Sequence, residues 1–212
     1  MTFRKGGTVQ FEGDKSRSVY CVLEGWLVMS KALSDGQNQI IDFAMPGDIV
    51  DPAGADGRTS VMNIGALTDG SVAAMPRRIW TQMINTWPTL QRRVYLTQAA
   101  KQARYNERLL RLGKGPADMR IAYALLEFAM RLRAIKKDSV SEFRIPMTQQ
   151  QLGDYVGLCS VHVCRTLRRL MRNGIIDMRK QMHIKVLDLD ALGELARAEH
   201  EGLKNEIMPI RL

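Results

Sequence analysis

The residues that could bind a polyanion gather in one stretch, "TQQQLGDYVGLCSVHVCRTLRRLMRNGII", Thr148 to Ile176. The stretch holds four arginines, two cysteines and one histidine on a regular apolar frame. Arginine offers a flat fork of hydrogen-bond donors that suits phosphates and the edges of bases. The stretch is therefore either a helix pair that lays its polar edge on DNA or the basic outer face of an ordinary bundle.

The sequence offers few residues that could act in catalysis or bind a metal. The sequence has no glycine-rich phosphate loop and no metal-spaced set of His and Cys, and its three histidines, at 162, 183 and 200, all lie in the last third. We therefore expect neither an enzyme nor a metal site.

The cysteines and the apolar runs predict where the chain resides. Three cysteines, at 21, 159 and 164, do not form a secreted disulfide framework, and the start "MTFRKGG" lacks the apolar run of a signal peptide. No apolar stretch reaches the roughly 18 residues that a membrane span requires. We expect a cytoplasmic protein without a membrane segment.

The charge favours an acidic partner such as nucleic acid. The net charge is +9 and the isoelectric point is near 9.7. Residues 88–137 carry 12 basic and 3 acidic residues, while 1–87 has a net charge of −1 and 138–212 of +1. Some of the middle cations should face solvent and attract DNA at long range; the alternative is a solvated face without a role in binding.

The elements that must position the basic stretch begin with a strand-rich zone. Residues 1–76 are short apolar or alternating runs separated by Gly-Gly, Glu-Gly, Asp-Gly and Pro-Gly turn signals, which predicts an antiparallel sandwich or barrel. "RRIWTQMINTW" then reads as a short helix closed by the Trp87-Pro88 step.

A long helix is predicted from Pro88 to Leu112, with proline at its first position and Gly113 after its end. A stripe of apolar residues follows one face, and we expect it to pack against the same stripe of a second copy: Leu96, Ala99, Ala103 and Leu110. "PADMRIAYALLEFAMRLRAIKK" predicts a second helix, and "DSVSEFRIP" a linker with a short strand.

The basic stretch itself predicts a winged helix-turn-helix. Thr148 and Gln151 have the spacing of a capping box, and Gly157 permits a sharp turn before a second helix over about 159–172. Val163, Leu167 and Leu170 should face inward. The basic and polar residues of that helix should face outward: His162, Arg165, Arg168, Arg169 and Arg172. "IIDMR" and "MHIKVLD" then flank Lys180 and Gln181 as a hairpin.

Taken together, "GGTVQFEGD", "YCVLEGWLVMSK", "DGQNQIIDFAMPGDIVD", "RIAYALLEFA" and "MTQQQLGDYVGLCSVHVCRTLRRL" resemble the CRP/FNR superfamily of bacterial transcription regulators. The resemblance implies an α+β protein: an antiparallel, jelly-roll-like β-roll over 1–87 with a sensor-like role, a dimerisation helix over 88–114 and a winged helix-turn-helix over 115–212. It also implies a homodimer on a two-fold symmetric DNA operator, and contact with RNA polymerase. The helix that usually precedes the β-roll is absent from this sequence.

The resemblance also assigns residues to DNA. The family commonly presents Glu-Thr-x-x-Arg to the major groove, where this chain has Val161, His162, Val163, Cys164 and Arg165. Arg165 matches and can fork onto guanine, whereas Val161 would instead touch a thymine methyl group. The remaining candidates are phosphate contacts or their neighbours: Thr148, Gln149, Gln150, Ser160, His162, Arg168, Arg169 and, at the wing tip, Lys180.

The effector pocket departs from the family pattern. Where cyclic-nucleotide binders carry a glutamate and an arginine, this chain has Asp48 and Ser60, with Arg58 two residues early. Tyr105 and Asn106 occupy the helix positions that meet the base, and a tyrosine there would fill the pocket. We expect no control by cyclic AMP, and no iron-sulfur cluster, since Cys21 is the one cysteine near the start.

Two interpretations remain open. Cys159, at the start of the second helix, and Cys164, beside Arg165, form a hypothetical redox site at the DNA interface, because helix amides and a nearby cation stabilise a thiolate; the alternative is that they are small apolar fillers. The rival function for the whole chain is a ligand-binding or protein-interaction β-roll without specific DNA binding.

Overall fold

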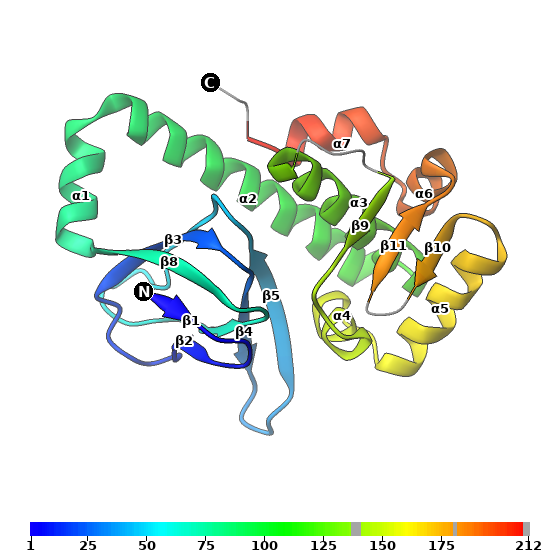
Figure 1. Cartoon of the computed structure of the whole chain (residues 1–212), viewed down its shortest axis with the longest axis horizontal. Coiled ribbons are helices and arrows are strands. Elements are labelled where there is room, and N and C mark those ends of the chain that lie inside the picture. Colours follow the sequence, from blue (N-terminus) through cyan, green and yellow to red (C-terminus); the bar gives the residue numbers. More distant parts are fainter. Residues whose placement is uncertain (137–140, 180–181, 210–212) are drawn as a thin grey trace. The chain divides into compact units, whose positions relative to one another are not determined.

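The computed structural model describes residues 1–136, 141–179 and 182–209. By its internal contacts the chain divides into two compact units, Met1–Pro88 and Thr89–Leu212 (Figure 1). The first unit carries the strand-rich zone and the short helix that follows it, and the second carries the other described helices and the predicted wing. Lys180, the predicted wing-tip contact, lies outside the described residues.

The first unit is the predicted antiparallel β-roll. Its elements are β1 (Thr2–Phe3), β2 (Thr8–Gln10), β3 (Ser18–Glu24), β4 (Leu27–Ala32), β5 (Asn38–Ala44), β6 (Ile49–Val50), β7 (Asn63–Ala66), β8 (Gly70–Pro76) and α1 (Arg77–Thr86). Two antiparallel sheets have the orders β1-β8-β3-β6 and β2-β7-β4-β5. The short helix predicted after Pro76 is α1.

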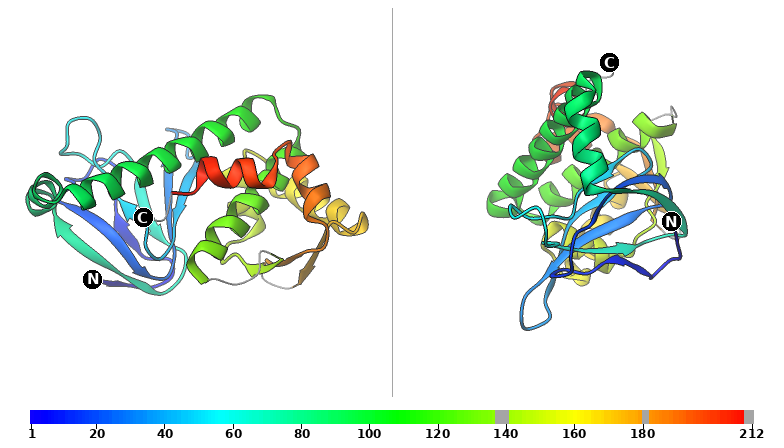
Figure 2. Two further views of the ribbon diagram at one scale, coloured as in Figure 1. Left: turned by 90° about the horizontal axis from the view of Figure 1, so that it is seen from above. Right: turned by 90° about the vertical axis from the view of Figure 1, so that its left-hand side faces the viewer.

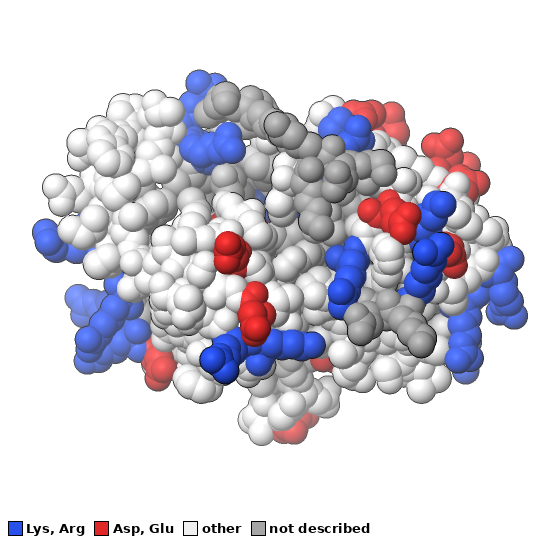
Figure 3. Space-filling view, viewed as in Figure 1, with Lys and Arg blue, Asp and Glu red and all other residues white. Residues whose placement is uncertain are grey.

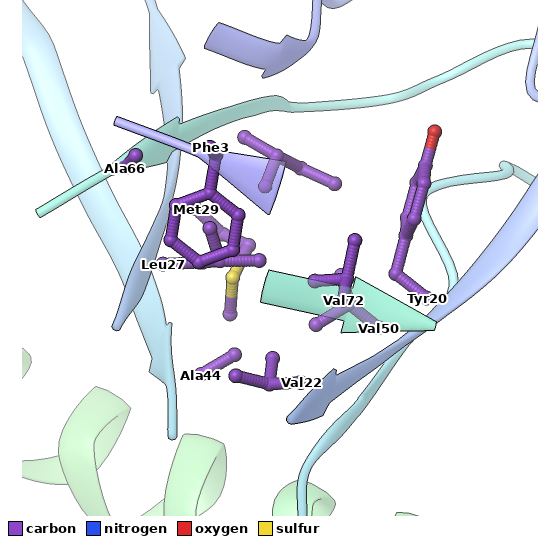
Figure 4. Close-up of a cluster of buried hydrophobic side chains, with 10 residues drawn as sticks. Phe3, Tyr20, Val22, Leu27, Met29, Ala44, Val50, Ala66 and Val72 are labelled. Carbon is purple, nitrogen blue, oxygen red and sulfur yellow. The ribbon is translucent and has the colours of Figure 1, made fainter. Parts of the chain in front are cut away.

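Apolar side chains from both sheets fill the inside of the roll. Leu27 and Met29 alternate inward along β4 and are at most 1% exposed. They meet residues from the other strands: Phe3, Tyr20, Val22, Ala44, Val50, Ile64, Ala66 and Val72 (Figure 4). Burial of each large apolar side chain contributes about 1.5–3 kcal/mol, so this cluster stabilises the first unit.

An ion pair joins the start of α1 to the roll. The two terminal nitrogens of Arg77 donate to the two carboxylate oxygens of Asp51, at 2.9 and 2.5 Å, and one of them also donates to Ser16 Oγ at 3.0 Å. The side-chain hydrogen bond from Asp51 raises the pKa of Arg77, although burial opposes this. Because Arg77 is the first residue of α1, the bridge fixes where the helix leaves the sheet.

The second unit places a long helix on a winged helical domain. Its elements are α2 (Pro88–Lys114), α3 (Ala117–Lys136), β9 (Glu142–Arg144), α4 (Gln149–Val156), α5 (Ser160–Arg172), β10 (Ile176–Arg179), β11 (His183–Val186), α6 (Leu189–Ala196) and α7 (His200–Ile207). The strands form a sheet of order β10-β11-β9. Within the described residues, no helix has both the length and the apolar character needed to cross a bilayer.

The buried face of α2 is lined by arginine. Arg104, Arg108 and Arg111 are 4–6% exposed. Arg104 donates to the carbonyl of Ile207 at 3.1 Å, and Arg111 donates to that of Ala196 at 3.0 Å. These carbonyls end α7 and α6, where a cation stabilises the helix dipole. Figure 2 shows α7, in red, beside α2.

The predicted dimer stripe follows a different side of α2. Ala99 and Leu110 are exposed, while Leu96 and Ala103 are half-buried. Tyr95 and Leu109 are also exposed, at 70% and 69%, which leaves large apolar side chains on the helix surface. The assignment of the stripe to a dimer contact stays a prediction.

Candidate nucleic-acid interface

The first helix of the predicted pair starts at a capping box, as expected. Thr148 Oγ1 accepts from the Gln151 amide at 3.1 Å, and Gln151 Oε1 accepts from the Thr148 amide at 2.9 Å. The two bonds satisfy amides that the first turn of a helix leaves unpaired. Thr148, Gln149 and Gln150 therefore have fixed backbone positions at the start of α4.

Two glycines shape the turn between α4 and α5. Gly157 has φ 66° and ψ 43°, the left-handed conformation that ends α4. Gly153 lies inside α4, where a Cβ would stand 2.3 Å from the carbonyl oxygen of Leu158. The turn passes so close to α4 that only glycine fits. The sequence interpretation included Gly157 and missed Gly153, although a glycine inside a short helix is itself a sign of close packing.

The second helix has the predicted inner and outer faces. Val163, Leu167 and Leu170 are at most 1% exposed. On the outside an open groove of about 820 Å³ is lined by Gln149, Ser160, Val161, Cys164, Arg165, Arg168, Met171 and Arg172. Lys and Arg side chains gather over α5 at the right of Figure 3. Its apolar inner face therefore anchors α5 and its basic face stays open.

The groove brings together five of the ten residues assigned to DNA: Gln149, Ser160, Val161, Arg165 and Arg168. Val161 is 61% exposed, and Arg165 and Arg168 are exposed beside it. His162 is exposed on the same helix, and Gln150 donates to Asp154 at 2.8 Å within α4. Met171 also lines the groove and was not among the predicted residues. The contacts of all these side chains with DNA stay a prediction.

Arg169 has an intramolecular partner. Its guanidinium donates to the carboxylate of Asp118, in the first turn of α3. The salt bridge joins α5 to α3 across 51 positions of the sequence. Arg169 was grouped with the DNA-binding residues because of its type and its place on the helix, and this contact gives it a structural role as well.

The predicted wing is a three-stranded sheet. β10 and β11 are antiparallel, with Ile176 opposite Val186 and Arg179 opposite His183. β9, the short strand expected in the linker, pairs with β11 on its other side. The hairpin therefore follows α5 directly, as the winged form of the motif requires.

The two cysteines near the start of α5 differ in exposure. Cys159 is the exposed residue before the first turn, and its Sγ lies 3.4 Å from Nδ1 of His162. Cys164 is half-buried and lines the groove. A redox role for either thiol stays a prediction.

The three predicted effector residues of the first unit lie in different surroundings. Ser60 is 2% exposed and donates to the Met62 carbonyl at 2.8 Å, while Arg58 points to solvent as an exposed residue. Asp48 accepts from the amide of Met45 at 2.8 Å.

The two other effector candidates belong to α2, in the second unit. The ring of Tyr105 lies 5.2 Å from the guanidinium of Arg108. Asn106 accepts from the side chain of Gln102 at 2.9 Å.

Comparison with known proteins supports both halves of this architecture. The cyclic nucleotide-binding domain matches residues 1–86, and the Crp-like helix-turn-helix domain matches 119–195. The transcriptional activator protein anr of Pseudomonas aeruginosa is 31% identical over 200 residues, which cover 94% of this chain and 81% of that protein. The chain belongs to the CRP/FNR family.

Other CRP/FNR relatives agree. The nitrogen fixation regulation protein FixK of Bradyrhizobium diazoefficiens is 36% identical over 176 residues, covering 82% of this chain and 72% of that protein. The crystallised FixK2 of Bradyrhizobium japonicum has a TM-score of 0.84 and 27% identity, covering 94% and 97% of the two chains. As a CRP/FNR protein the chain is a DNA-binding transcription regulator that acts as a homodimer, in a family that is not enzymatic.

Proposed function

We propose that the groove on α5 receives one half-site of a two-fold symmetric operator. The groove carries this proposal because it gathers an exposed cation, an exposed apolar side chain and the start of α4 in one concave surface. In a helix-turn-helix the N-terminal residues of the second helix meet the bases, and the first helix crosses the phosphate backbone.

We divide the side chains of the groove and of the adjoining surface of α4 and α5 by chemistry. Arg165 reads a guanine through O6 and N7, and Val161 packs against a thymine methyl group. The remaining groups hold the backbone and are indifferent to sequence: Thr148, Gln149, Gln150, His162 and Arg168. This half-site should differ from that of relatives that place glutamate at the position of Val161.

We propose that the β-roll is not controlled by cyclic AMP. Burying a phosphate requires a positioned cation, and the residue at the expected position is Ser60, already bonded to Met62. The inside of the roll is filled by the apolar side chains of the cluster in Figure 4. Neither a cyclic nucleotide nor an iron-sulfur cluster is expected as cofactor.

The partners follow from the family. We propose that α2 carries the dimer contact through Leu96, Ala99, Ala103 and Leu110, and that the DNA-bound dimer contacts RNA polymerase in the cytoplasm. Relatives named as transcriptional activators support the polymerase contact.

The test is selection of an operator from random-sequence duplexes by the purified protein, followed by fluorescence anisotropy titration. We expect a palindromic site and a dimer by light scattering. Failure to enrich any sequence would refute the proposal and favour the β-roll as a protein-interaction or ligand-binding module. Addition of cyclic AMP should leave the affinity unchanged; a marked tightening would refute the assignment of the roll.

A further inference from the structure

The helices α2, α3 and α4 meet at one buried carboxylate. Glu127, in the middle of α3, is 0% exposed. The hydroxyl of Tyr155, on α4, lies 3.0 Å from each of its oxygens. Arg131 donates to Oε1 at 3.3 Å, and Arg104 of α2 lies 3.9 Å from the same oxygen. The carboxylate therefore has a partner on each of the three helices.

A second contact ties α2 to the same tyrosine. The guanidinium carbon of Arg108 lies 4.3 Å from the centre of the Tyr155 ring. The attraction between a cation and an aromatic face is stronger when both are shielded from water. The hydroxyl of Tyr155 is thus held by α3 and its ring by α2, and the residue is 0% exposed.

These contacts are directional, and a purely apolar seam would not be. Buried charges are tolerated only when their hydrogen bonds and ion pairs are well made, so a small rotation of α4 against α2 would leave a buried charge without its partner. An apolar interface of the same area could slide with little loss. The cluster therefore specifies one angle between the long helix and the first helix of the helix-turn-helix.

That angle reaches the recognition helix through a rigid connection. α4 and α5 pack on each other across the turn at Gly153 and Leu158, where the Leu158 amide donates to the Gly153 carbonyl at 2.9 Å. Fixing Tyr155 therefore fixes α5. In a dimer joined through α2, the distance between the two copies of α5 depends on this angle.

We propose that Tyr155 and Glu127 are positioning residues that set the spacing between half-sites which the dimer accepts. The inference rests on the proposed function, in which α5 reads a half-site and α2 carries the dimer contact. Neither residue touches DNA, since both are buried, so their effect should appear only where two half-sites are read together.

The test compares two tyrosine variants that lose the same atom. Tyr155→Phe removes a hydroxyl that bonds Glu127. Tyr123→Phe removes one that is also buried, on α3, but has no hydrogen-bond partner among the described residues. The probes are the operator selected by the wild-type protein, the same duplex with one base pair inserted between the half-sites, and a duplex with one half-site scrambled.

We expect the wild-type protein and Tyr123→Phe to lose about tenfold or more in affinity on the insertion, as for a mismatched contact. Tyr155→Phe should bind the correct operator several-fold more weakly and lose less than about threefold on the insertion, with affinity for the single half-site unchanged. Glu127→Gln, which keeps the shape but not the charge, should act in the same direction.

Circular dichroism and thermal unfolding establish that each variant is folded, and Tyr155→Phe remains informative if Glu127→Gln does not fold. The inference would be overturned if folded Tyr155→Phe still lost about tenfold in affinity on the insertion, as the wild-type protein is expected to. It would also be overturned if Tyr123→Phe tolerated the insertion as well as Tyr155→Phe does. If the wild-type protein itself did not distinguish two half-sites from one, the proposed function would fail first.

Discussion

Arg165 and Arg168 line the same groove, three positions apart on α5. We expect Arg165 to contact a base and Arg168 to contact the phosphate backbone. Arg165→Ala should cost about 1–3 kcal/mol of binding free energy and relax the preference at one base pair per half-site. Arg168→Ala should weaken binding to all sequences alike. Anisotropy titrations on the selected operator and its single-base-pair variants measure both effects. Uniform loss in both variants would contradict the division into base and backbone contacts.

The alkylation rate of Cys21 should rise at a higher pH than that of an ordinary thiol. Burial raises the pKa of Cys21, and the nearby carboxylate of Asp48 raises it further. A raised pKa means less thiolate at a given pH, so labelling by iodoacetamide should be slow near neutrality and keep rising well into the alkaline range.

The exposed thiol of Cys159 is the internal comparison, followed by mass spectrometry of the same sample. In urea the difference should disappear, because unfolding removes the burial of Cys21. Equal rates in the folded protein would refute the prediction.

Single residues also mark the limit of the sequence interpretation. The capping pair at Thr148 was predictable because both partners lie within four residues. The salt bridge of Arg169 to Asp118 was not, because its partner is 51 positions away. The same reason explains why the burial of Arg104 and Arg111 on α2 was not predicted, since their carbonyl partners lie 103 and 85 positions away.

Among the elements, the close approach of the turn to α4 makes Gly153 sensitive. A Cβ at Gly153 would meet the backbone of Leu158, so Gly153→Ala should push the turn and the start of α5 outward. Overpacking of this kind costs about 1–3 kcal/mol of unfolding free energy. Urea unfolding measures the stability, and operator titration should show a parallel loss of affinity.

Gly113→Ala is the matched control, since Gly113 is also helical and its Cβ would meet nothing within 4 Å. That change should be neutral or stabilise slightly, by up to about 1 kcal/mol. Equal destabilisation by both changes would mean that helix propensity, and not the turn, explains Gly153.

The elements themselves were largely predictable, for local reasons. Turn signals and alternation indicated the strands, and Pro88 and the capping box marked the helix starts. The order β1-β8-β3-β6 was not predictable, since it depends on pairing between strands far apart in the sequence. α2 ends at Lys114, two residues beyond the predicted end, because Gly113 continues the helix.

At the scale of the whole molecule, the net charge overstates the number of cations that are exposed to DNA. Among the basic residues of 88–135, four are buried: Arg104, Arg108, Arg111 and Arg131. The affinity should still fall steeply with salt, by a slope of about −0.9 in log affinity against log salt for each phosphate neutralised. Arg168→Gln should reduce that slope by about 2 per dimer, since each protomer loses one contact.

Arg133→Gln, on the exposed side of α3, separates the two interpretations of the middle zone. A reduced slope would give these cations a role in attracting DNA, and an unchanged slope would make them a solvated face. A flat salt dependence in the wild-type protein would refute the electrostatic prediction as a whole.

The buried arginines of α2 constrain the order in which the second unit can fold during synthesis. Arg104 bonds a carbonyl 103 positions later, and Arg111 one 85 positions later. Both arginines therefore leave the ribosome long before their partners and cannot be buried until the last helices follow. A chain released before α7 would leave Arg104 without that carbonyl. The buried face of α2 is therefore completed only after α6 and α7 have been made.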